Sequence, residues 1–224
     1  MTKVLSGLVL LCLGGAWVAI AQQAGMAHIR FTFENSQLQP ASYVMDINED
    51  GTGHFNSQPG NATAIDTQGV APQAVTTDIK IEEPLRSLLF KTARSHNYFN
   101  VACESAKNKV AFTGKKVLQY SGPDGNGSCT FNWSHDQQLM KAADDLVAVA
   151  FTLEEGRRLT VEHEHNRLGL DEELEALQDA VKGGRAQQIQ NIAPQLQAIA
   201  SDEKVLERAR LRARQLLAGD GKSG

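Results

Sequence analysis

The chain has 224 residues, a hydrophobic fraction of 42%, a charged fraction of 21% and a formal net charge of −4 at pH 7. This length suits one generous domain or two small ones, and it is enough to bury a core without cross-links. The mild acidity argues against nucleic acid or an anionic membrane surface as a general partner.

Residues 1–21 have the pattern of a secretory signal peptide. Lys3 supplies the positive charge, residues 4–20 form an apolar run, and Ala19-Ile20-Ala21 matches the cleavage site, which predicts cleavage after Ala21. An uncleaved membrane anchor is the alternative, but the run is shorter than the roughly 20 apolar residues that span a bilayer. We therefore expect a secreted or periplasmic protein with no stable membrane anchor after cleavage.

The cysteines indicate one disulfide. Cys12 leaves with the signal peptide, so Cys103 and Cys129 remain as an even pair in an exported chain. A redox or metal role is the alternative, but the wide spacing lacks the C-x-x-C pattern of thiol chemistry or of zinc sites. We predict a structural disulfide between Cys103 and Cys129.

The N-terminal half reads mainly as β-strands. Apolar side chains alternate with polar ones, as in Ile29, Phe31 and Phe33, and Asp50-Gly51 is typical of a tight hairpin turn. The predicted strands are residues 29–34, 42–47, 52–57, 75–81, 109–112, 116–121 and 128–133. We expect an antiparallel meander with a long surface loop at residues 58–73.

One helix interrupts these strands. Pro84 suits a first helical turn, the preceding glutamates suit the positive end of the helix dipole, and the leucine spacing predicts a helix to about His96. Residues 122–127 superficially resemble a phosphate-binding loop. They precede a strand instead of a helix N-terminus, so we predict a hairpin turn.

The C-terminal part is predicted to be helical. Ser134 and Gln137 match a capping box at the start of the first helix, which Gly156 ends or kinks. Three further helices are predicted, at residues 170–182, 189–199 with an interruption at Pro194, and 202–217.

These elements predict an α+β fold: an N-terminal antiparallel sheet with one packed helix, followed by a C-terminal run of about four helices. We divide the chain into a signal peptide (1–21), a mainly antiparallel β region with one helix (22–134), a helical region (135–218) and a disordered tail (219–224). A domain boundary is expected near residues 156–169.

The best candidate for chemistry is the cluster of two glutamates and two histidines at residues 162–165. The H-E-x-x-H zinc motif is absent, and on a helix His163 and His165 point roughly 200° apart. We therefore favour a solvated helix face and assign no catalytic residue, cofactor or metal. His163 and His165 remain the candidates for the alternative, a metal-assisted hydrolase.

Four arginines, Arg208, Arg210, Arg212 and Arg214, form the one concentrated basic run. On a helix they divide between two faces, and no aromatic residues are interleaved, so we expect no nucleic-acid partner. A role for this helix in binding a partner protein stays open.

Residues 111–116 and 127–132, together with residues 166–170, resemble a group of uncharacterised exported bacterial proteins. The resemblance implies export, and the group has no activity that it would assign to this chain. Our first hypothesis is a non-enzymatic exported protein whose sheet edge or helical tail binds another envelope or extracellular protein. The alternatives are the metal-assisted hydrolase and a structural or stress-related envelope protein.

Overall fold

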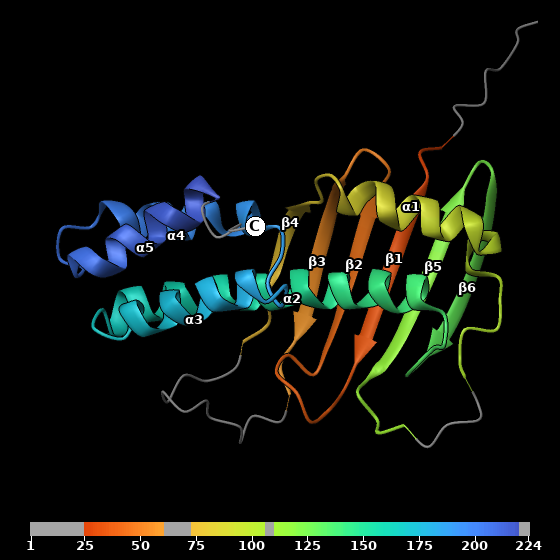
Figure 1. Ribbon diagram of the computed structural model, residues 1–224, viewed down its shortest axis with the longest axis horizontal. Helices are drawn as coiled ribbons and strands as arrows, with labels where there is room; N and C mark the ends of the chain where they lie inside the picture. Colours follow the sequence, from red (N-terminus) through yellow and green to blue (C-terminus); the bar gives the residue numbers. More distant parts are fainter. Residues whose placement is uncertain (1–24, 61–72, 106–109, 220–224) are drawn as a thin grey trace, which may run out of the picture.

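The computed structural model describes residues 25–60, 73–105 and 110–219 (Figure 1). The predicted signal peptide and its cleavage site lie outside these residues, as does the predicted tail beyond Gly219. The fold is α+β, with a sheet in the N-terminal half followed by helices, as the sequence predicts.

Six antiparallel strands form one sheet in the order β4-β3-β2-β1-β5-β6, so β1 lies inside the sheet and β4 and β6 are its edges. The strands are β1 (His28–Glu34), β2 (Ser42–Asn48), β3 (Thr52–Gln58), β4 (Thr76–Lys80), β5 (Lys115–Gly122) and β6 (Gly125–Phe131). Phe31 lies opposite Met45 on β2 and opposite Leu118 on β5, and all three side chains are fully buried.

Helices cover one face of the sheet (Figure 1). They are α1 (Leu85–Ser95), which matches the predicted helix, and the first half of α2 (Gln137–His165). The opposite face carries the polar side chains of the alternating pattern, and no helix of the described chain packs on it (Figure 1). A half-solvated antiparallel sheet requires this alternation, which explains why the strands are readable from the sequence.

Helix α2 connects two hydrophobic clusters. Its side chains from Leu139 to Leu153 belong to the cluster under the sheet, whereas Leu159 belongs to a second cluster built with the C-terminal helices. Gly156 lies between the two sets, inside a helix that continues to His165. In Figure 1 α2 runs across the sheet and past β4 into the C-terminal helices.

The C-terminal layer consists of α3 (Leu170–Lys182), the 3₁₀ helix η2 (Ile189–Ile192), α4 (Ala193–Ser201) and α5 (Glu207–Ala218). Pro194 lies in the first turn of α4, so the predicted break falls at the junction of η2 and α4. Helix α5 begins later than predicted, because the N–H of Val205 donates to the carbonyl of Asp202 in a turn before it. None of the helices in the described ranges is long and apolar enough to cross a bilayer.

The strand predicted at residues 109–112 is wrong for the part that the structure describes, residues 110–112. The side chain of Asn132 bonds this segment instead: its Nδ2 donates to the carbonyl of Ala111 at 3.1 Å, and its Oδ1 accepts from the N–H of Thr113 at 2.8 Å. The side chain of Phe112 stays exposed, at 64%. Apolar residues at alternate positions do not form a strand without a neighbouring strand to pair with.

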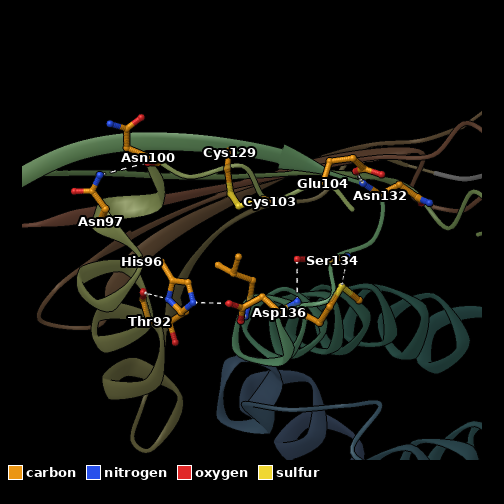
Figure 2. The surroundings of a disulfide bond; sticks show 12 residues. Thr92, His96, Asn97, Asn100, Cys103, Glu104, Cys129, Asn132, Ser134 and Asp136 are labelled. Atoms are coloured by element: carbon orange, nitrogen blue, oxygen red, sulfur yellow. Dashed lines mark hydrogen bonds and ion pairs between the residues drawn. A yellow bond between two sulfur atoms is a disulfide. The ribbon is translucent and has the colours of Figure 1, made fainter. Parts of the chain in front are cut away.

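Asp136, not the predicted Ser134, caps α2 (Figure 2). Its Oδ1 accepts from the N–H groups of Gln138 at 2.9 Å and Leu139 at 3.1 Å, while Ser134 Oγ accepts from the N–H of Asp136 at 3.2 Å. A carboxylate adds a negative charge to the positive end of the helix, which a hydroxyl cannot do. The predicted capping box at Ser134 is therefore corrected.

The predicted disulfide between Cys103 and Cys129 is confirmed (Figure 2). Cys129 lies on the buried face of β6, and Cys103 belongs to the segment that follows α1. The bond therefore attaches this segment, which has no regular structure around Cys103, to an edge strand of the sheet.

We predict that replacing Cys103 and Cys129 together by alanine lowers the free energy of unfolding by about 3–4 kcal/mol, because the bond closes a loop with a sequence separation of 26. For a chain of this size the melting temperature then falls by roughly 10 °C, measurable by calorimetry. Wild-type protein kept in reductant is the control and should show the same loss. An unchanged melting temperature would contradict this role.

We predict that Asp136→Ala lowers the free energy of unfolding by about 1 kcal/mol at pH 7, the usual value of an N-cap. Burial raises the pKa of Asp136, but the N–H of Leu139, the His96 ring at 2.8 Å and the N–H of Gln138 outweigh it and hold the pKa below its ordinary value.

A lowered carboxyl pKa stabilises the fold above the ordinary pKa, and this stability is lost as pH falls through the lowered value. The difference in the free energy of unfolding between wild type and Asp136→Ala, measured by urea unfolding, should therefore decrease below about pH 5. Asp179→Ala, at an exposed position of α3, is the control. A difference that stays the same at pH 7 and at acid pH would contradict the prediction.

Candidate functional site

A groove of about 750 Å³ lies between the start of β4 and the second half of α2. Residues 73–77 form one side, and α2 contributes Arg157 and Val161 to the other. Leu153 and Ile192 add buried apolar side chains to its lining. We call it the β4–α2 groove. It borders a sheet edge, because β4 is the last strand of the sheet.

The chain that follows α3 reaches back to the end of β4 through η2. The N–H of Lys80 donates to Asn191 Oδ1 at 2.7 Å, and the carbonyl of Lys80 accepts from Asn191 Nδ2 at 3.0 Å. The N–H of Glu82 donates to Gln188 Oε1 at 2.7 Å. Side-chain amides of this segment therefore occupy the last backbone groups of the edge strand.

The earlier backbone groups of this edge point into the space beside β4. In an antiparallel pair every second residue bonds to the neighbouring strand and the others face away. Val75 accepts from the N–H of Ser57 on β3, and Lys80 faces away, so the backbone groups of Thr76 and Asp78 also face away. Among the residues described, neither forms a backbone–backbone hydrogen bond outside the sheet, and the carbonyl of Asp78 accepts from Thr77 Oγ1 at 3.2 Å.

Two buried polar atoms of the groove lining have no hydrogen-bond partner: Arg157 Nη1 and Gln195 Oε1. The remaining guanidinium nitrogens of Arg157 bond Glu154 Oε1, with Nε at 2.7 Å and Nη2 at 2.6 Å. A buried donor or acceptor without a partner costs about 1–3 kcal/mol, so native proteins leave few of them. One donor and one acceptor in the same groove indicate a place where a ligand supplies the missing partners.

The groove depends on a close approach of η2 to α2 at Gly156. A Cβ atom at this position would lie 2.4 Å from Ile192 Cγ2, a distance at which the two elements must move apart. A glycine in the middle of a helix costs about 1 kcal/mol relative to alanine. Here its lack of a side chain permits the packing that sets the width of the groove.

The structure does not bring His163 and His165 together. His163 Nε2 bonds Asp202 Oδ2 at 2.9 Å, and the N–H of Lys204 together with this imidazole lowers the pKa of Asp202. His165 is 72% exposed, lines the β4–α2 groove, and has Glu164 Oε2 at 3.7 Å. No group of three or more potential metal ligands converges within residues 25–60, 73–105 and 110–219.

All four arginines of the basic run form ion pairs inside the helical layer. Arg208 and Arg212 bond Asp171 of α3, at 2.8 Å and 3.1 Å. Arg210 and Arg214 pair with Glu207 at the start of their own helix. Arg208 and Arg212 therefore connect α5 to α3, which the sequence pattern by itself does not indicate.

A second groove, of about 690 Å³, lies between the start of α1 and the C-terminal end of α5. Its lining is mostly apolar and includes Leu85 and Leu216. The buried carboxylate of its wall has partners from the same wall: Asp145 accepts from Lys141 Nζ at 2.9 Å and from Gln187 Nε2 at 2.6 Å. Because these groups already have partners, this groove has less need of a specific polar ligand than the β4–α2 groove.

No protein-family model matches the chain, and a search of curated proteins finds no match. The resemblance to uncharacterised exported bacterial proteins therefore stays a prediction.

From the sequence we named one residue of the groove, His165, as a candidate, but we did not identify the residues that define the groove. Arg157, with Glu154 three residues before it, has the pattern of an ion pair on a solvated helix, and Gln195 has the pattern of a polar helix position. No local sequence pattern indicates the role of Asn191, because its partner, Lys80, is 111 residues away in the chain.

We predict that Gly156→Ala lowers the free energy of unfolding by about 1–2 kcal/mol, because overpacking against Ile192 exceeds the gain in helix propensity. Urea unfolding followed by circular dichroism measures the change. Glu164→Ala, at an exposed position of the same helix, is the control and should stay within about 0.5 kcal/mol. A more stable Gly156→Ala protein would show that η2 does not pack closely on α2.

Proposed function

We propose that this is an exported, non-enzymatic binding protein, and that the β4–α2 groove holds a segment of another envelope or extracellular protein. One observation carries the proposal: a single groove combines an open strand edge with buried polar atoms that have no partner, Arg157 Nη1 and Gln195 Oε1. Both features are satisfied when a partner chain supplies hydrogen-bonding groups.

Export is part of the proposal. It is supported by the signal-peptide pattern of residues 1–21 and by the disulfide between Cys103 and Cys129, a bond that persists in oxidising compartments. The site after Ala21 would release the protein to the periplasm or the extracellular medium.

The chemistry of the groove favours binding over catalysis. Nucleophilic catalysis needs a hydroxyl or thiol within hydrogen-bond reach of a base. The hydroxyl of Thr160 donates to the carbonyl of Gly156 at 3.0 Å, and the hydroxyl of Thr76 accepts from Asn56 Nδ2 at 2.9 Å. The exposed His165 has Glu164 Oε2 at 3.7 Å from its Nε2, and these described groups form no nucleophile–base pair.

We predict that Val161→Trp, which fills the groove from its helical side, lowers affinity for a partner protein at least tenfold. The tagged mature protein is used to capture partners from an envelope extract, and the captured protein is then purified and titrated by calorimetry. Leu217→Trp, at a partly exposed position of the second groove, is the matched control and should bind like wild type.

Circular dichroism and a thermal melt establish that both variants are folded. A purified partner that binds Val161→Trp as tightly as wild type would overturn the β4–α2 groove as the binding site.

A further inference from the structure

We infer that the partner segment, whose existence rests on the function proposed above, binds in extended form as an additional antiparallel strand on β4. The inference comes from the two sides of the groove. Thr76 lies on the strand side of the groove, and the outward backbone groups of Asp78 follow it along the same edge. Arg157 and Gln195, each with one unpartnered buried atom, belong to the lining contributed by α2 and α4.

Asn191 already makes the first pair of such a strand. Its amide donates to the carbonyl and accepts from the N–H of the same residue, Lys80. Two bonds exchanged with one residue are the pattern of an antiparallel pair, whereas a parallel strand would divide them between two residues. The side chain of Asn191 thus imitates a peptide unit at the end of β4, and it also lines the groove.

The edge continues from this pair toward the start of β4. Asp78 and Thr76 are the next residues whose backbone groups face outward, and Ala74 follows at the same period and lines the groove. A segment that pairs with all three spans about five residues, or roughly 17 Å in extended form.

The opposite edge of an added strand also needs hydrogen bonds, because its outer N–H and carbonyl groups would enter a partly enclosed groove. Both atoms are buried, and when their side chains turn toward an occupied groove Arg157 Nη1 can donate to a carbonyl and Gln195 Oε1 can accept from an N–H. One donor and one acceptor are what an extended backbone edge requires. A helical ligand would offer its backbone groups to neither, because they are bonded within the helix.

The groove also predicts the side-chain pattern of the segment. Residues opposite Thr76 and Asp78 place their side chains on the polar face of the sheet, as these two residues do. The residues between them turn toward Leu153, Val161 and Ile192 of the groove lining. We expect apolar residues at every second position of the segment and polar residues between them.

The test uses a synthetic peptide as the probe. Eight-residue peptides are selected from a random display library against the mature wild-type protein, with Val161→Trp as the counter-selection. The best peptide is then resynthesised with an N-methyl group at each position in turn. Strand addition predicts that methylation lowers affinity at least tenfold at alternate positions and less than twofold between them.

Amide hydrogen exchange followed by NMR gives a second, residue-level measurement. On peptide binding the outward N–H groups of Thr76 and Asp78 should exchange at least tenfold more slowly. Thr77 should change less, because its N–H already points to β3. Protection confined to the α2 side of the groove would overturn strand addition.

Asp78→Pro tests the strand edge and Gln195→Met tests the opposite side of the groove, with Ser128→Pro as the control. Asp78→Pro removes one outward N–H and leaves the pairing with β3 intact, so peptide affinity should fall at least tenfold. Ser128→Pro does the same on the other edge strand, β6, and should have no effect. Gln195→Met removes the acceptor across the groove and should lower affinity several-fold. Thermal melts verify that all three fold.

The outcomes separate this inference from the proposed function. Peptides that compete for the groove without the alternating N-methyl pattern would overturn strand addition and leave the groove as a binding site. If neither a peptide nor a protein binds in a way that Val161→Trp abolishes, the proposed function fails and this inference fails with it. A dimer that blocks the peptide and is lost in Asp78→Pro would make a second copy of this chain the occupant, and would overturn the separate partner protein.

Discussion

The 29-residue helix α2 has to bury apolar side chains in two hydrophobic clusters at once. Its first half packs on the sheet, and its second half carries α3 and α4. A helix of this length is roughly 44 Å long, so it continues past the last strand (Figure 1). The C-terminal helices therefore lie beyond β4, and the space beside this edge is bordered by α2 and η2. The position of the candidate site follows from this one packing constraint.

The outward groups of β4 divide into two sets. At its C-terminal end, side-chain amides from η2 and the residue before it bond Lys80 and Glu82, which fixes the helical layer to the sheet. Closer to its start the edge stays open beside the groove. Asp78, whose side chain is 97% exposed, places a charge on this open part. Charges on edge strands discourage indiscriminate pairing, so a partner strand has to tolerate a carboxylate at that position.

The β4–α2 groove and the groove between α1 and α5 differ in whether their buried polar groups have hydrogen-bond partners. In the groove between α1 and α5, the carboxylate of Asp145 has both an ammonium and an amide as partners. In the β4–α2 groove, Arg157 uses two of its nitrogens on Glu154 and leaves the third without a partner. A buried guanidinium nitrogen is costly to leave unsatisfied, which is why we assign the binding role to this groove.

The sequence by itself determined the elements that depend on local pattern. Alternation in residues such as Ile29, Phe31 and Phe33 identified strands, because one face of the sheet is buried and the other is solvated. Cys12 belongs to the predicted signal peptide, and the two cysteines that remain identified the disulfide. The same reasoning failed at residues 110–112, where the alternation is present but the side chain of Asn132 takes the backbone groups that a neighbouring strand would need.

Only the tertiary structure decided the candidate site. It placed His163 against Asp202 and left His165 at the rim of a groove, although only Glu164 separates the two histidines in the sequence. It also brought Asn191 to Lys80 across 111 residues and left Arg157 Nη1 buried without a partner. Whether a polar atom is satisfied depends on neighbours from distant segments of the chain. Local sequence periodicity, which reports only solvent exposure along one element, contains no information about them.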